Sequence, residues 1–212
     1  GGEETADFDA SEKLYNAEVD YLDDQIGGLL EFIQSEDLEE ETVFVIVADH
    51  GENLGEDNMM GHQFSVSEQL ISVPLMIKAP KLAESNVEVQ TELKELYDIV
   101  PWLAGIDDEP AYGKGIALGG YQKPELDLKN IPKDKHEELG KRLLFARGDR
   151  KKLVRKGHED PEDSMIDLPS GDEMDIDPEF AEKLDDIDRA ESGSTEVDDE
   201  EIKDRLEDLG YM

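Results

Sequence analysis

The run of five apolar residues at positions 43–47, read as VFVIV, constrains the fold of this chain more than any other feature. Four of the five are β-branched, and such an unbroken run is typical of a strand buried on both faces, as in a parallel sheet. The run ends in Ala48-Asp49-His50-Gly51. Asp49 and His50 therefore leave the carboxyl end of the predicted strand, where open α/β sheets place their ligands.

The loop after this strand carries side chains that can bind a metal. Asp49 and His50 offer a carboxylate oxygen and an imidazole nitrogen to a divalent cation. Three glycines make the loop rich in turns, and His62 at its end is near enough in sequence to fold back over the pair. Each residue alone also has an ordinary explanation, because such an aspartate commonly caps a turn and a lone histidine is usually structural. Glu52 and Glu56 are expected to be solvated.

The apolar spacing of the other segments predicts an α/β fold. Apolar residues recur every three or four positions over residues 10–34, which predicts a long amphipathic helix. Its glycine pair at 27–28 predicts a close backbone approach. The further predicted elements are a short helix at 65–70, a strand at 73–77, a helix at 93–103, a loop-rich stretch at 107–132, strands at 143–146, 153–155 and 165–168, and helices at 178–187 and 199–209.

The charge balance excludes some classes of partner. The chain has 21 Lys and Arg against 57 Asp and Glu, a net charge of −36, so nucleic acid and anionic membranes are not expected partners. No apolar run approaches the roughly 20 residues that a bilayer requires. The acidity fits either a disordered chain or a folded protein from a high-salt cell, such as that of a halophilic archaeon. The regular apolar segments favour the second. The absence of cysteine excludes disulfides and thiolate metal sites within these residues.

The loop and its flanks closely resemble the C-terminal half of sulfatases, which belong to the alkaline-phosphatase superfamily. The resemblance rests on DHGENLGE at 49–56, GH at 61–62, Glu68, VPL at 73–75, YLDDQIG at 21–27, YDIVPWLAGI at 97–106, a hairpin near 147–156 and LEDLGY at 206–211. It implies an α/β fold: the C-terminal part of an alkaline-phosphatase-like sheet with flanking helices over residues 1–110. A small antiparallel α+β subdomain would follow over residues 111–212.

The resemblance also implies an activity and its residues. Sulfatases hydrolyse sulfate esters, of small molecules or glycans, at one divalent cation that is usually calcium. By position, Asp49 and His50 would bind the metal. His62 would face the sulfate, where it would stabilise charge or assist the leaving oxygen.

The sequence also departs from the sulfatase pattern. It contains no Cys/Ser-x-Pro-x-Arg motif, from which sulfatases make their formylglycine nucleophile, and no early pair of metal-binding aspartates; SVPLM at 72–76 does not fit the motif. We therefore expect a C-terminal portion that is inactive alone. Two alternatives stay open. One is a phosphodiesterase, phosphonate hydrolase or phosphoethanolamine transferase of the same superfamily; the other is a non-catalytic acidic binding protein.

Overall fold

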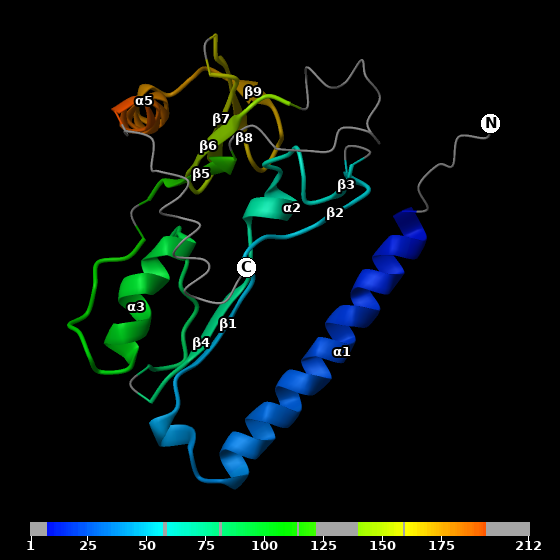
Figure 1. The fold of residues 1–212 in the computed structure, drawn as a ribbon, viewed down its shortest axis with the longest axis vertical. Helices are drawn as coiled ribbons and strands as arrows, with labels where there is room; N and C mark the ends of the chain where they lie inside the picture. The colour runs from blue at the N-terminus through cyan, green and yellow to red at the C-terminus, as the bar shows by residue number, and fades with distance from the viewer. Residues whose placement is uncertain are drawn as a thin grey trace, which may run out of the picture.

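The computed structural model describes residues 8–56, 59–80, 82–113, 115–121, 140–158 and 160–193. Helices and short 3-10 turns alternate with strands in the first half, and a five-stranded sheet dominates the second (Figure 1). The helices are α1 (Phe8–Ser35), α2 (Glu68–Ile71), α3 (Leu96–Leu103) and α5 (Pro178–Gly193), with 3-10 turns η1 (Glu39–Glu41) and η3 (Leu93–Glu95). The strands are β1 (Phe44–Val47), β2 (Asn53–Leu54), β3 (Met60–Gly61), β4 (Leu75–Lys78), β5 (Ala117–Tyr121), β6 (Leu143–Arg147), β7 (Lys151–Lys156), β8 (Glu162–Asp167) and β9 (Glu173–Met174). The predicted helix at 199–209 lies outside the described residues.

The strand predicted at 43–47 is present as β1, but its environment differs from the prediction. β1 pairs with β4 in an antiparallel ladder, with Val45 opposite Ile77. Helix α3 covers this pair through Ile99 and Leu103, which are buried against Ile77 and its neighbours. Val47 is 39% exposed. The expectations of a parallel pairing and of burial on both faces are therefore wrong for the described residues, since α3 covers one face and α1 contributes no buried residue.

The second half forms an antiparallel sheet in the order β5-β6-β7-β8-β9, with α5 packed on it. The hairpin predicted near 143–155 is confirmed as β6 and β7, and the strand predicted at 165–168 overlaps β8. Strand β5 was not predicted, because its two central glycines read as a loop. A Cβ on Gly119 would lie 2.6 Å from Cζ of Phe145, so glycine makes room here for the neighbouring ring. The core between sheet and helix consists of Leu144, Ala146, Leu153, Met165, Phe180 and Leu184.

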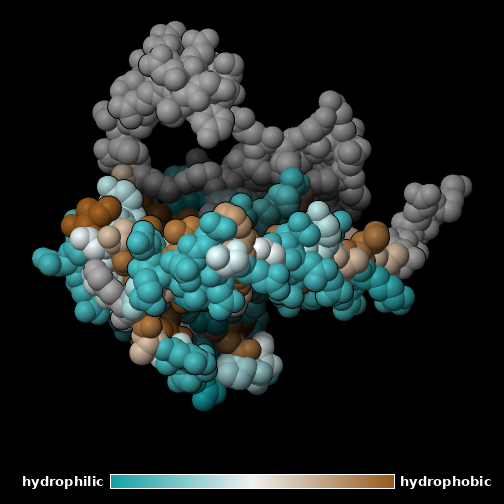
Figure 2. Space-filling model, turned by 90° about the horizontal axis from the view of Figure 1, so that it is seen from below, coloured by the Kyte–Doolittle hydropathy of each residue, from teal (hydrophilic) through white to brown (hydrophobic). Residues whose placement is uncertain are grey.

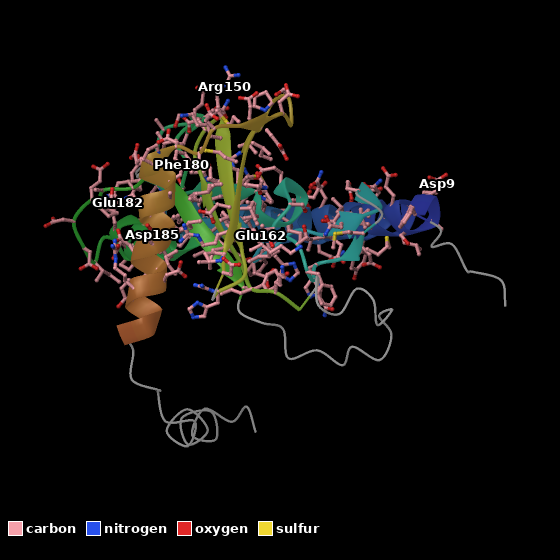
Figure 3. All side chains as sticks on the ribbon, turned by 90° about the horizontal axis from the view of Figure 1, so that it is seen from above. Asp9, Arg150, Glu162, Phe180, Glu182 and Asp185 are labelled. Atoms are coloured by element: carbon pink, nitrogen blue, oxygen red, sulfur yellow. The ribbon has the colours of Figure 1, made fainter. Side chains whose placement is uncertain are left out.

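Ion pairs attach α5 to the sheet. Arg155 on β7 is 5% exposed and donates two hydrogen bonds of 2.8 Å to Asp163 on β8. It also donates bonds of 2.7 Å to Asp185 and Asp188 on α5. These carboxylates, those of Asp163 first, raise the pKa of Arg155 above its ordinary value, so its charge is permanent. Figure 3 shows α5 beside the sheet, with Phe180 and Asp185 labelled on it.

Helix α1 has about the predicted length and pattern, but only its first residues approach a strand, where Phe8 lies against Gly55 next to β2. It begins at Phe8, ends at Ser35 and has no buried residue. Figure 1 shows α1 and α3 on opposite sides of the β1–β4 pair. The close approach expected at Gly27 and Gly28 is not seen, because a Cβ at either position would have no described atom within 4 Å outside the helix itself.

One face of the molecule is mostly hydrophilic. In Figure 2, which shows this face from below, hydrophobic residues gather in small groups. Within the described part of the chain, no helix has both the length and the apolar character that crossing a bilayer would demand.

Candidate functional site

A short hairpin folds the loop after β1 back on itself. Strands β2 and β3 pair antiparallel, with Asn53 opposite Gly61 and Leu54 opposite Met60. The next positions outward on this ladder are Glu52 and His62, so the register brings these two residues opposite each other. The hairpin therefore gives a local reason why two residues ten positions apart in sequence meet.

Asn53 holds this hairpin from the inside. Its side chain is buried, with 1% exposure, and its Nδ2 donates a hydrogen bond of 3.1 Å to the carbonyl oxygen of Gly61. Its Oδ1 accepts a hydrogen bond of 2.8 Å from the hydroxyl of Ser67. Because a buried amide is stable only when hydrogen-bonded, this side chain fixes the hairpin against the segment that leads into α2.

His50 and His62 lie side by side. Their ring centroids are 4.4 Å apart, and the ring planes make an angle of 28°. Oε2 of Glu52 lies 3.6 Å from Nδ1 of His62. One ligand atom from each of His50, Glu52 and His62 lies within 4.8 Å of the other two. The arrangement places two imidazoles and one carboxylate within reach of a single small ligand.

Contacts with the local backbone fix the orientation of His50. Its Nδ1 lies 2.8 Å from the carbonyl oxygen of Gly51. A carbonyl oxygen only accepts hydrogen bonds, so Nδ1 carries the hydrogen in this contact and Nε2 presents the lone pair. The amide of His50 donates a hydrogen bond of 2.9 Å to Oδ1 of Asp49.

Gly51 fastens the loop to α2. Its amide donates a hydrogen bond of 2.9 Å to the carbonyl oxygen of Leu70. A Cβ at this position would lie 1.8 Å from the carbonyl oxygen of Gln69, a distance that no side chain allows. Only glycine therefore lets the backbone pass α2 this closely.

Helix α2 is in turn fixed to the five-stranded sheet by Glu68. The carboxylate of Glu68 accepts hydrogen bonds of 3.1 Å from Nε of Arg147 and 2.9 Å from Nζ of Lys152. Lys152 is buried and also donates to the carbonyl oxygen of Val66 at 2.9 Å. The site loop is thus connected through α2 to the most tightly packed part of the molecule.

The predicted site residues do not all have the same surroundings. Asp49 is a neighbour of His50, with 3.9 Å between Oδ1 and Nε2, and its side chain is 91% exposed. His50 and His62 lie together, as expected for a loop that folds back over the strand end. Their functional roles, and that of Asp49, stay predictions.

The expectation of a solvated side chain holds for Glu56, which is exposed, whereas Glu52 is partly buried. Glu52 lies beside the two histidines. It is two positions after His50, and the β2–β3 register places it opposite His62. Hydrogen bonds from its own amide and from the amide of Leu54, at 2.7 Å for the latter, hold the pKa of Glu56 below its ordinary value. Glu56 therefore helps to close the turn, whereas Glu52 is available to a ligand.

Comparisons with known proteins point to one family. Residues 3–106 match the family model described as Sulfatase. The chain is 29% identical over 112 residues to a choline-sulfatase of Rhizobium meliloti (strain 1021), and this alignment covers 47% of this chain and 22% of that protein. It is 28% identical over 113 residues to an uncharacterized sulfatase, YidJ, of Escherichia coli (strain K12), covering 53% of this chain and 20% of that protein. The match thus spans about a fifth of each relative's length.

Solved structures extend the likeness to the fold. A structure described as a complex with its substrate D-glucosamine-2-N,6-O-disulfate superposes with a TM-score of 0.57 and 18% identity, over 79% of this chain and 37% of that one. A 2-O glycosaminoglycan sulfatase superposes with a TM-score of 0.53 and 17% identity, over 90% of this chain and 42% of that one. The mixed α/β fold is therefore similar to part of the sulfatase fold.

Proposed function

We propose that this chain forms part of a sulfuric ester hydrolase, with the loop at residues 48–62 in its active site. The observation that carries the proposal is the pairing of His50 with His62 at the carboxyl end of β1, within the segment that matches the sulfatase model. The loop gathers two imidazoles and one carboxylate at one place, and catalytic residues are often carried on loops that a packed scaffold positions. The proposed substrate is the sulfate ester of a small molecule or a glycan.

His62 is proposed to act on the sulfate group. Its ring is half-exposed, so an oxygen of a bound ester can reach it. As a hydrogen-bond donor it would stabilise the charge that develops on sulfate oxygens, or it would assist departure of the alcohol oxygen. The stack against His50 restricts the orientations of the ring and keeps it beside the proposed metal ligands.

Asp49 and His50 are proposed to contribute two ligands to a divalent cation, calcium by analogy with sulfatases. The exposed carboxylate of Asp49 suits a hard cation, which takes six to eight oxygen ligands. The described residues offer only part of such a shell, so the proposal assigns its remainder to residues outside them. When bound, the cation would neutralise the sulfate oxygens.

The nucleophile is proposed to come from the part of sulfatases that this chain does not match. The long apolar stripe of α1 supports this division, because its large side chains, among them Leu22 at 56% and Phe32 at 56%, are exposed in the described structure. A surface of this kind normally packs against another part of a domain. We propose that the unmatched part of a sulfatase-like domain covers it. These residues are expected to be inactive alone.

Turnover by the full-length protein tests the function. We expect release of 4-nitrophenol and sulfate from 4-nitrophenyl sulfate, with much slower release of 4-nitrophenol from bis(4-nitrophenyl) phosphate. The reverse preference would identify a phosphodiesterase-like member of the superfamily and overturn the proposal. A non-catalytic binding protein would be indicated by two results together. Neither ester would be turned over, and calcium binding measured by calorimetry would be unchanged in both Asp49→Ala and His50→Ala.

A further inference from the structure

We propose that His50, Glu52 and His62 form a binding site for Zn²⁺, distinct from the Asp49–His50 pair assigned to calcium. Two imidazole nitrogens and one carboxylate oxygen form a donor set typical of zinc and of other borderline transition metals. Calcium prefers a shell built almost entirely of oxygen. The three side chains that the hairpin brings together thus differ in chemistry from the site that the sulfatase resemblance implies.

The spacing of the ligand atoms fits a tetrahedral ion after a small adjustment. Zinc binds nitrogen and oxygen at about 2.0–2.2 Å, so neighbouring ligand atoms of a tetrahedral site lie about 3.3 Å apart. One ligand atom from each of the three residues lies within 4.8 Å of the other two. Closing this difference requires small side-chain rotations, for which the partial exposure of His50 and His62 leaves room on the solvent side.

The surroundings already hold one ligand in a metal-binding orientation. The contact between Nδ1 of His50 and the carbonyl oxygen of Gly51 leaves Nε2 as the ligand atom. Histidines that bind zinc commonly donate their second ring nitrogen to a carbonyl or a carboxylate in this way. The β2–β3 register holds Glu52 opposite His62, and buried Asn53 secures that register.

The zinc site would keep an open position. Three protein ligands leave the fourth position of a tetrahedral ion to water, and the cluster faces solvent, where water reaches it. His50 would serve both this site and the calcium pair, so the two ions cannot bind at the same time. Zinc binding itself needs neither a substrate nor a nucleophile.

Calorimetric titration of the 212-residue chain with Zn²⁺, in 1 M KCl to suppress diffuse binding to the many carboxylates, tests the proposal. We expect one site, with affinity at least tenfold weaker in Glu52→Gln and in His62→Ala. His158→Ala, which removes an exposed histidine outside the cluster, serves as the matched control and should keep the affinity within threefold. Asp49→Asn tests whether the carboxylate beside His50 also binds the ion, and it should weaken binding less than Glu52→Gln does.

Substitution with Co²⁺ provides a second measurement. A tetrahedral site with nitrogen and oxygen ligands gives visible absorption bands, which should appear at one equivalent in the wild type and vanish in His62→Ala. Circular dichroism verifies that each variant is folded. If His62→Ala does not fold, the test relies on Glu52→Gln, which is nearly isosteric with the wild type. Absence of a single-site component, or an equal loss in Asp49→Asn and Glu52→Gln, would overturn the proposal. Because no ester is used, this result is independent of the sulfatase assay.

Discussion

Buried charge is a residue-scale feature that affects stability. Lys152 is 4% exposed and pairs with Glu68 and with the carbonyl oxygen of Val66. Removing one partner of a buried pair costs about 3–5 kcal/mol, because the other charge loses its compensation. Arg147 also contacts Glu68 and would compensate part of that charge. We therefore expect Lys152→Met to lower the free energy of unfolding by about 3 kcal/mol.

A surface ion pair gives the matched control for this prediction. Lys78 contacts Glu39 at 2.7 Å, with side-chain exposures of 58% and 37%. Exposed pairs contribute about 0–1 kcal/mol, so Lys78→Met should change the free energy of unfolding by less than about 1 kcal/mol. Urea denaturation of both variants provides the comparison. Equal effects would contradict the view that Lys152 holds α2 on the sheet.

Tyr121 gives the molecule a measurable response to alkaline pH. Burial raises the pKa of Tyr121 to about 12, against an ordinary value near 10. Its neutral form therefore contributes stability that is complete below pH 10 and is lost as the pH rises toward 12. Tyr121→Phe should lack this part of the alkaline loss, so the unfolding free energy of the wild type minus that of the variant should fall as the pH rises from 9 to 12. A constant difference would show that Tyr121 does not titrate abnormally.

At the same scale, the sequence identified some of the candidate site residues and undervalued one. Asp49, His50 and His62 could be selected because an apolar run ends beside them and glycines surround them. Glu52 was discounted, since acidic residues are abundant throughout this chain. Its proximity to His62 depends on which residues pair across the hairpin, and a one-residue change of register would place it elsewhere.

At the scale of elements, glycine has opposite effects in two places. Gly51 passes α2 so closely that a methyl group would collide with the carbonyl oxygen of Gln69, whereas Gly28 lies on α1 with open space around it. We expect Gly51→Ala to lower the free energy of unfolding by about 2 kcal/mol or more. Gly28→Ala should raise it by up to about 1 kcal/mol, because alanine favours the helix.

Thermal unfolding monitored by circular dichroism at 222 nm separates the two substitutions. The zinc affinity of each variant relative to that of the wild type adds a second measurement, since displacement of the loop at Gly51 would also disturb His50. Similar stability of both variants would mean that the loop does not pack on α2 as described.

The elements themselves could be predicted more easily than their partners. Period and turn residues are local signals, and they located α1, α3, β1 and the β6–β7 hairpin within a few residues, together with the start of α5, which ends six residues later than predicted. The direction of the ladder between β1 and β4 is set by packing with distant residues, so the run at 43–47 could not reveal it. Strand β5 could not be predicted because its two glycines are required by distant residues: Gly119 makes room for the ring of Phe145, and Gly120 lies against the backbone of Leu143.

At the scale of the whole molecule, the net charge of −36 dominates. Repulsion among carboxylates destabilises a compact state, and molar salt shortens its range to about 3 Å. We propose that the protein is adapted to high salt. Its unfolding midpoint should be at least about 10 °C higher in 3 M than in 0.1 M KCl. Equal midpoints would remove this explanation of the composition.

The most direct test of the sulfatase proposal is kcat/KM for 4-nitrophenyl sulfate with the full-length protein and its variants. Groups that stabilise developing charge commonly contribute a factor of about 10²–10³. We therefore predict that His62→Ala and Asp49→Ala each lower kcat/KM at least 100-fold, whereas His158→Ala changes it less than threefold. Wild-type values for His62→Ala and Asp49→Ala in an active enzyme would contradict the placement of its active site at residues 48–62.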